Sequence, residues 1–286
     1  MTHLTIPKTY KLYIGGKFPR TESGRSYEVT TPKGKFLANA ALASRKDGRD
    51  AVVAARAAQP GWAGATAYNR GQVLYRIAEV LEGRREQFIA EISASEGVSK
   101  SVATAQVEAA IDSWVWFAGW ADKYVQVAGT GNPVAGPYFN LSVPEPTGVV
   151  AIVAPQGKGA SLLGLVNVVA PAIVSGNTVV VIASEQHPLS SISLAEVFAT
   201  SDLPGGVVNV LTGSPAEIAP WLASHADVNA LDLAGADALD WVELEIAAAD
   251  TLKRVLHPEP GVPPRTLDRI VALTETKTVW HTKALI

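Results

Sequence analysis

The stretch GVVAIVAPQGKGASLLG, from Gly148 to Gly164, decides the fold. It begins with an uninterrupted run of small and branched apolar residues, passes through a glycine-rich loop and continues as a second apolar run. Continuous apolar strands are typical of parallel sheets buried on both faces, and the second run is typical of the helix that follows such a strand. The stretch therefore predicts one β-α unit of an α/β domain of the nucleotide-binding type.

The chain repeats this alternation beyond Gly164. The predicted elements are strands at 149–154, 178–182, 207–211 and 230–233, and helices at 161–175, 189–199, 217–224 and 239–249. Such units join parallel strands by right-handed crossovers. We therefore expect an α/β fold in which helices flank a Rossmann-like parallel sheet.

The N-terminal half is predicted to begin with a hairpin and to continue as helices. Residues 10–18, YKLYIGGKF, alternate in polarity around two glycines, which predicts two short strands. Asp47 is the expected N-cap of a helix that ends at Pro60, and longer helices are expected at 69–91 and 102–125.

Aromatic residues are concentrated in the helix predicted at 102–125. At helical spacing, one side carries Trp114, Phe117, Ala121 and Tyr124, and another carries Trp116 and Trp120. Aromatic stripes at this spacing usually bury area, so we expect packing in a core or an interface in preference to ligand stacking.

Composition excludes several classes of function. A net charge of −3 and a pI near 6.0 give no reason to expect nucleic acid or an anionic membrane as a partner. The longest apolar run, 161–174, is too short to cross a bilayer, and the N-terminus lacks the pattern of a secretory signal, so we expect a cytoplasmic protein. The sequence contains no cysteine, and its histidines lack metal-ligand spacing, so we expect no metal site.

Two segments outside the α/β alternation predict extended structure. Residues 138–146, YFNLSVPEP, are interrupted by prolines and suit an edge strand or a bulged hairpin. Residues 274–282, TETKTVWHT, alternate in polarity and predict a final strand. The proline-rich LHPEPGVPPR between the α/β part and this strand predicts a linker.

The order of motifs resembles the N-terminal half of the aldehyde dehydrogenase superfamily. The resemblance rests on ARAAQPGWAGATAYNRGQVLYRIAEVLEGRREQFIAEIS, FAGWADKY, EPTGVVAIVAP, GNTVVV, SEQHPLS, LPGGVVNVLTG and SHADV, which follow one another from Tyr10 to about Ala236. TETKTVWH resembles the last strand of that family, which belongs to an oligomerisation arm. The chain is most similar to the noncatalytic second module of the aldehyde dehydrogenase 16 group.

The resemblance implies a division of the chain. Residues 1–137 and 149–256 would form the Rossmann-like cofactor-type domain, and 138–148 and 274–286 the strands of the arm. A linker and a short connecting element at 257–273 would stand where the family has its catalytic domain, which carries the nucleophilic cysteine.

The resemblance also implies that this chain has no catalytic residues. Aldehyde oxidation in the family needs a thiolate, and no thiol is present. The family's P-W-N turn, whose asparagine stabilises the oxyanion, is here Pro155, Gln156 and Gly157. Loss of one such donor usually costs roughly 2.7–4 kcal/mol. The general-base motif E-L-G-G is absent too.

The implied cofactor site is degenerate. It comprises Pro155, Gln156, Gly157, Lys158, Ile182, Ser184, Glu185, Gly213 and Gly235. Ile182 stands where the family's Lys-Pro-x-Glu segment has the lysine that holds the ribose, although Glu185 keeps the glutamate. Ala236 replaces the serine of F-T-G-S. Two lost polar contacts would weaken NAD by roughly 2–4 kcal/mol, so we expect NAD to bind weakly or not at all.

Three functions remain open. The first is a noncatalytic subunit that docks through its arm onto a full-length aldehyde dehydrogenase, because in the family the arm of one subunit pairs with the catalytic domain of its neighbour. The second is a stand-alone NAD(H)-binding module. The third is an enzyme of different or residual chemistry, for which Gln156, Lys158, Glu185 and His187 are the polar residues near the loop. The first is preferred, because the second needs bound nucleotide despite Ile182 and Ala236, and the third lacks an acid–base pair at suitable spacing.

Overall fold

The computed structural model describes residues 6–258 and 265–283, and a five-stranded sheet lies at its centre. The strand order is β10-β9-β6-β7-β8, and every neighbouring pair is parallel. These strands are β6 (Val149–Val153), β7 (Thr178–Ile182), β8 (Val208–Leu211), β9 (Ala230–Asp232) and β10 (Arg254–Leu256). The predicted α/β fold with a parallel sheet is confirmed.

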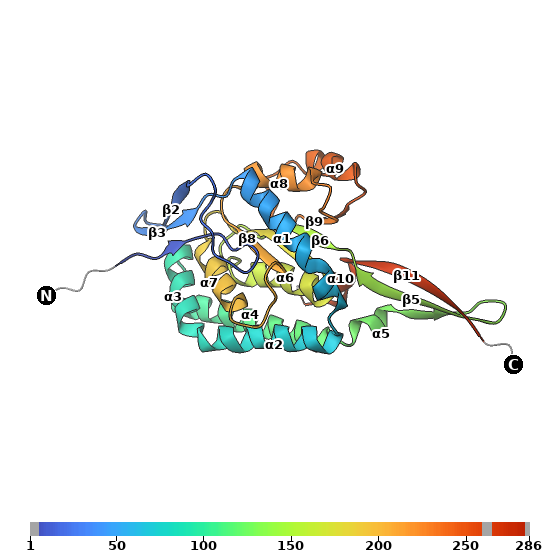
Figure 1. Cartoon of the computed structure of the whole chain (residues 1–286). Helices are drawn as coiled ribbons and strands as arrows, with labels where there is room; N and C mark the ends of the chain where they lie inside the picture. The colour runs from blue at the N-terminus through green and yellow to red at the C-terminus, as the bar shows by residue number, and fades with distance from the viewer. Residues whose placement is uncertain (1–5, 259–264, 284–286) are drawn as a thin grey trace.

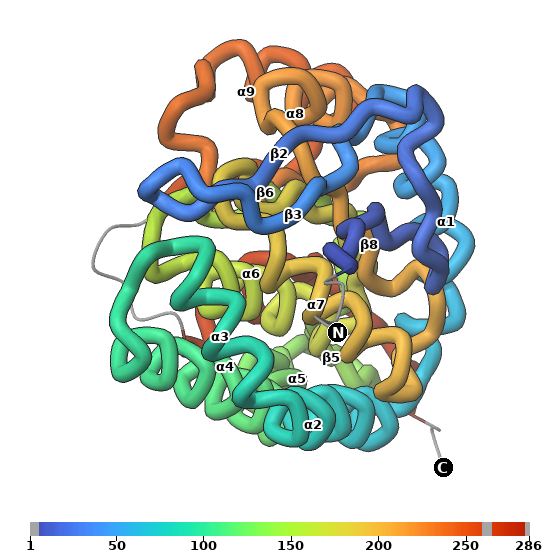
Figure 2. The backbone as a smooth tube through the Cα atoms, turned by 90° about the vertical axis from the view of Figure 1, so that its left-hand side faces the viewer, coloured from blue at the N-terminus to red at the C-terminus, as the bar shows by residue number. Residues whose placement is uncertain are grey.

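Helices cover both faces of this sheet (Figure 2). One face packs against α6 (Leu163–Val174) and α7 (Leu189–Phe198), and the other against α1 (Arg45–Gly64), α8 (Pro215–Ser224) and α9 (Trp241–Ala249). A second helical layer lies outside α6 and α7 and consists of α2 (Ala67–Gly83), α3 (Arg85–Glu96) and α4 (Lys100–Trp120). Two apolar cores result, one on each face of the sheet.

The start and the end of α1 differ from the prediction. Ser44 is the N-cap, and Asp47 stands three positions later, where its carboxylate accepts the backbone N–H of Ser44 at 2.7 Å. The two side chains therefore form a capping box, in which an acidic residue at the third position satisfies the N-cap. Pro60 lies inside the helix, which continues to Gly64 because Trp62 is buried and its indole donates to the carbonyl of Ile173.

The helix predicted at 69–91 is two helices. The break lies at Arg84, whose φ of −109° and ψ of 11° are not helical. Its guanidinium forms an ion pair with Glu196 of α7 at 2.6 Å. The helix predicted at 102–125 likewise ends at Trp120, and α5 (Tyr124–Ala128) follows.

The aromatic stripe of α4 is packed as expected. Trp114, Phe117, Ala121 and Tyr124 are buried, and the Trp114 ring meets that of Phe198 edge-on at 5.8 Å. Trp116 and Trp120 are half-buried and pack against the same core. The aromatic residues therefore join the outer helices to the layer on the sheet.

The N-terminal segment forms a small sheet in place of the predicted hairpin. Its strands are β1 (Thr9–Tyr10), β2 (Ser26–Thr30) and β3 (Phe36–Ala41), in the order β1-β3-β2. Only a single bridge, between Ile14 and Lys17, closes the turn at the two glycines, and Tyr13 pairs with Val210 of β8. The predicted turn forms, with bonds between Ile14 and Lys17 and from the N–H of Leu12 to Pro19, but its flanks are not paired as regular strands because Tyr10 and Tyr13 pair with β3 and β8.

The predicted arm strands pair with each other and project from the body (Figure 1). The arm consists of β4 (Thr130–Asn132), β5 (Tyr138–Pro146) and β11 (Thr274–Thr282), all antiparallel, with β5 in the middle. The prediction of an edge strand at 138–146 is wrong only at residues 140–142, where β4 covers the second side of β5. Pro144 and Pro146 are tolerated because β4 pairs only as far as Ser142, which leaves one side of β5 open at the prolines.

A short helix connects β10 to the arm. It is α10 (Leu267–Val271), and Ile270 and Leu273 beside it are buried. Arg269 forms an ion pair at 2.6 Å with Asp232, a fully buried residue at the end of β9. Much of the proline-rich linker, 259–264, lies outside the described residues, and the assignment of 1–137 and 149–256 to one domain stays a prediction.

Candidate functional site

Loops at the carboxyl edge of the parallel sheet bring the predicted site residues together. The loops follow β9, β6, β7 and β8, which lie side by side in the sheet in that order. Ligands of open parallel sheets usually bind beyond this edge. The candidate site is therefore defined as the loops 154–162, 183–188, 212–214 and 233–240.

Gln156 ties the loop after β6 to the loop after β7. Its side-chain oxygen accepts the backbone N–H of Glu185 at 2.9 Å, and its backbone carbonyl accepts the Ser184 hydroxyl at 3.1 Å. Its side-chain nitrogen donates to the carbonyl of Ala154 at 2.5 Å. Both ends of the amide are therefore used within the chain, while the carboxylate of Glu185 is exposed.

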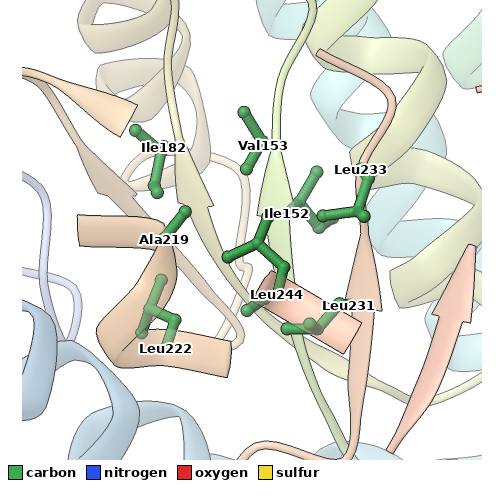
Figure 3. Close-up of a pocket in the computed structure, with 9 residues that line it drawn as sticks. Ile152, Val153, Ile182, Ala219, Leu222, Leu231, Leu233 and Leu244 are labelled. Atoms are coloured by element: carbon green, nitrogen blue, oxygen red, sulfur yellow. The ribbon is translucent and has the colours of Figure 1, made fainter. Parts of the chain in front are cut away.

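Ile182 belongs to the core and not to an open site. Its side chain is fully buried and points into a cavity between the sheet and helices α8 and α9 (Figure 3). Leu222 and Leu244 line the same cavity, whose volume is about 10 Å³. Ligand pockets usually measure about 300–1,000 Å³, so this cavity does not accommodate a nucleotide as it stands.

Gly235 is required by a close approach between two loops. A Cβ at this position would lie 1.8 Å from the carbonyl oxygen of Ala154 and 2.7 Å from the backbone nitrogen of Pro155. The N–H of Gly235 donates to the carbonyl of Val153 at 2.8 Å. Packing of the backbone therefore explains this glycine without a ligand.

Gly213 and Tyr27 lie near each other, and Tyr27 lies close enough to Glu185 for its charge to act on the phenol. Gly213 has a φ of +124°, which disfavours a side chain, and a Cβ there would lie 2.9 Å from Leu42. Burial raises the pKa of Tyr27, and the nearby Glu185 carboxylate raises it further. The small N-terminal sheet thus contributes Tyr27 to the surroundings of the site.

The glycine-rich loop is held by a residue far away in the sequence. Glu96, the last residue of α3, is fully buried and accepts the backbone N–H of Gly159 at 2.8 Å and that of Ser161 at 3.3 Å. Gly157 and Lys158, at the tip of the loop, are exposed. Pro155, at its base, is half-buried and packs against Gly164.

His187 is buried beside this loop. Burial lowers its pKa, the Glu96 carboxylate opposes that shift, and Lys158 adds to it. Neither ring nitrogen has a hydrogen-bond partner among the described residues. A neutral imidazole without such partners is poorly suited to hold a substrate proton or to be oriented for catalysis.

The described part of the chain contains neither a cluster of metal-ligating side chains nor a membrane-spanning helix. Within residues 6–258 and 265–283, no three histidine or acidic side chains converge as ligands would. Nor is any helix there long and apolar enough to cross a bilayer. The predicted cytoplasmic location stays a prediction.

Sequence motifs missed three side chains of this region, namely Tyr27, Glu96 and Gln106. Gln106 donates from its amide nitrogen to Glu96 at 2.9 Å. The first two belong to β2 and α3, so only the fold brings them to the loops. The sequence signal for Glu96 was the segment ISASEG, in which this acidic residue stands at the end of a helix.

Comparison with known proteins settles the family. The sequence model described as the aldehyde dehydrogenase family matches residues 18–261. This chain belongs to the aldehyde dehydrogenase family. Over 260 residues, or 88% of this chain, it is 31% identical to cytosolic 10-formyltetrahydrofolate dehydrogenase of Mus musculus. It is 33% identical to a mitochondrial aldehyde dehydrogenase of Leishmania tarentolae over 247 residues, or 86% of this chain.

Solved structures of other proteins share the fold. HpcC from Thermus thermophilus matches 87% of this chain with a TM-score of 0.80 and 29% identity. An aldehyde dehydrogenase from Bacillus cereus, solved as an NAD⁺ complex, matches 87% with a TM-score of 0.78 and 27% identity.

The chain spans only part of each relative. It covers 28% of the mouse protein, 49% of the Leishmania protein, and 47% and 50% of the two solved chains. The activities of those whole aldehyde dehydrogenases therefore reach this chain only as proposals.

Proposed function

We propose that this aldehyde dehydrogenase-family chain is a noncatalytic subunit that assembles with a full-length aldehyde dehydrogenase through its arm. The observation that carries the proposal is the exposed arm, which extends beyond the body and presents aromatic side chains to solvent (Figure 1). Phe139 is 60% exposed and Trp280 is 59% exposed. Large apolar side chains gathered on an exposed sheet mark an interaction surface.

Both faces of the arm carry apolar side chains. On one face, the hydroxyls of Ser142 and Thr278 lie 2.9 Å apart, and the rings of Tyr138 and Trp280 meet edge-on at 5.7 Å. On the other face, Leu141 is directly opposite Val279, with Phe139 next to them. The second face also carries the ion pair of Lys277 with Glu145 at 3.0 Å. Only its part formed by Phe139, Leu141 and Val279 therefore gains by burial.

The open edge of β11 supports the same proposal. In the described sheet, β11 pairs only with β5, so its other side presents unpaired backbone groups. A strand of this kind readily pairs with a strand from another chain. The family resemblance supplies the identity of the partner, since the arm of one subunit there pairs with the catalytic domain of its neighbour.

The lack of a nucleophile supports a noncatalytic role. The sequence has no cysteine, and Gln156 at the oxyanion turn donates its amide to the chain's own carbonyl of Ala154. Acyl chemistry of this family needs both a thiolate and an oxyanion donor. We therefore expect no aldehyde oxidation by this chain alone with NAD or NADP.

The competing function is a stand-alone NAD(H)-binding module, which the NAD⁺ complex of the Bacillus cereus relative favours. Against it stands Ile182, whose side chain fills the space between the sheet and α8. NAD at a free concentration of 100 times its dissociation constant would raise the free energy of unfolding by about 2.7 kcal/mol. An unchanged melting temperature at millimolar NAD supports the noncatalytic subunit, whereas a micromolar dissociation constant would favour the NAD(H)-binding module.

Co-purification tests the assembly. The tagged chain is expressed in its native host, and the proteins that elute with it are identified by mass spectrometry. We expect a full-length aldehyde dehydrogenase in stoichiometric amount with the unaltered chain, and its loss with the double variant Phe139→Glu, Leu141→Glu. The control variant Val53→Glu replaces an exposed apolar residue of α1, away from the arm, and should retain the dehydrogenase. Retention by the arm variant would overturn the proposal.

A further inference from the structure

The carboxylate of Glu96 is surrounded by N–H donors. One oxygen accepts the N–H of Gly159 at 2.8 Å and the amide of Gln106 at 2.9 Å, and the other accepts the N–H of Ser161 at 3.3 Å. The side chain is 0% exposed. Successive backbone N–H groups that converge on one carboxylate are the arrangement by which proteins hold small anions.

The loop conformation creates this arrangement. Gly159 has a φ of +82°, in the left-handed region, and α6 begins a few residues later at Leu163. A left-handed residue before a helix turns several N–H groups toward one point, and the helix dipole adds positive potential there. The loop therefore has the geometry of an anion-binding site.

A buried side chain also points to an anion at this position. His187 is 6% exposed, and neither of its ring nitrogens has a hydrogen-bond partner among the described residues, so its ring N–H is left to interact with an anion. The Lys158 charge acts on the same imidazole as Glu96 does. Buried polar atoms without partners are rare, and the Glu96 carboxylate is close enough to this imidazole to act on its charge.

We propose that the glycine-rich loop is an anion-binding site that the chain fills with its own Glu96 carboxylate. A free small carboxylate takes this place once the side chain of Glu96 is removed. The inference is independent of the proposed assembly, because it concerns the body of the molecule and not the arm.

This arrangement has a consequence for nucleotides. The N–H groups of Gly159 and Ser161 are the donors that a phosphate would use at this loop. Glu96 already occupies both, and its negative charge repels a second anion. Glu96 is thus a positioning residue, which fixes the loop and at the same time closes it to phosphate.

Chemical rescue tests the proposal. The variant Glu96→Ala leaves a space of the size of acetate, and its melting temperature is measured at pH 7.5 in 100 mM sodium acetate and in sodium chloride of equal ionic strength. We expect acetate to raise the melting temperature of this variant by about 3 °C or more relative to chloride, as for weak binding to a chain of this size. The unaltered chain should not respond.

The matched control is Glu86→Ala, which removes an exposed glutamate from the same helix. It should show no difference between acetate and chloride. Equal responses of the two alanine variants would overturn the proposal, because they would reflect a general effect of acetate. A third arm with inorganic phosphate tells whether the vacated site also accepts a larger anion, and a rise there beyond that of Glu86→Ala supports the same site.

A second variant covers the case in which Glu96→Ala does not fold. Glu96→Gln keeps the shape of the side chain and removes its charge. Each hydrogen bond to the side chain is then weaker, because a bond to a charged acceptor contributes more free energy than a bond to a neutral one. Exchange of the Gly159 and Ser161 amide hydrogens, followed by NMR, should become about tenfold faster. The N–H of Gly235, bonded to Val153, is the internal control and should be unchanged. Unchanged exchange at both loop amides would refute the role of Glu96.

Discussion

Substitution of Gly235 by alanine should destabilise the chain strongly, because the loops after β6 and β9 touch at this residue. The added Cβ would lie 1.8 Å from the Ala154 carbonyl oxygen, whereas real Cβ atoms keep at least 3.0 Å, so the backbones must separate by about 1.2 Å. Overpacking usually costs about 1–3 kcal/mol, and the 2.8 Å bond from Gly235 to Val153 contributes about 1 kcal/mol more. We expect a loss of about 3 kcal/mol in the free energy of unfolding.

Gly157 provides the matched control for this prediction. It lies in the loop after β6 too, and a Cβ there would meet no described atom within 4 Å. Gly157→Ala should change the free energy of unfolding by less than about 1 kcal/mol. Any such change should be stabilising, because alanine lowers the conformational entropy of the unfolded chain. Urea unfolding followed by circular dichroism measures both variants. Equal stabilities would refute the reasoning, because they would show that the close approach at Gly235 does not determine stability.

Three further predictions concern charge, pH and cofactor. Arg269→Ala leaves the buried carboxylate of Asp232 without its cation, and urea unfolding should show a loss of about 3 kcal/mol or more; a loss below about 1 kcal/mol would contradict the ion pair. The pKa of His187 is lowered by burial, so the unfolded chain binds a proton first near pH 6.5 and the contribution of His187 to stability is lost as pH falls below that value. His187→Asn should therefore lose less stability than the unaltered chain between pH 7.5 and pH 5.5, and identical pH profiles would contradict this. Calorimetry with NAD should give no dissociation constant below the millimolar range, because Ile182 fills the space beside α8.

The sequence predicts the parallel sheet because its signal is local. The continuous apolar runs of β6 and β7 are buried at every residue, as expected for central parallel strands. The break between α2 and α3 was missed because the apolar spacing continues across it, from Leu81 of α2 to Phe88 of α3. The small N-terminal sheet was missed too, since β3 is rich in alanine, which has low strand propensity.

The candidate site was predicted only in part, for the same physical reason. Motifs located the loops that carry Gln156 and Glu185, and the fold brings these loops into contact. Ile182 belongs to the core instead, and its burial could not be inferred from the motif alone. Glu96 lies more than sixty residues before the loop that it holds, so its role depends on how α3 packs.

The mass of a reconstituted complex shows whether the chain assembles with a full-length aldehyde dehydrogenase. The purified chain is mixed with the purified full-length aldehyde dehydrogenase that co-elutes with it, and light scattering coupled to size-exclusion chromatography gives the mass. We expect a defined complex containing both chains, which the variant Phe139→Glu, Leu141→Glu does not form and Val53→Glu does. A chain that stays monomeric beside the dehydrogenase, or an arm variant that forms the complex in full, would show that the chain does not dock through its arm.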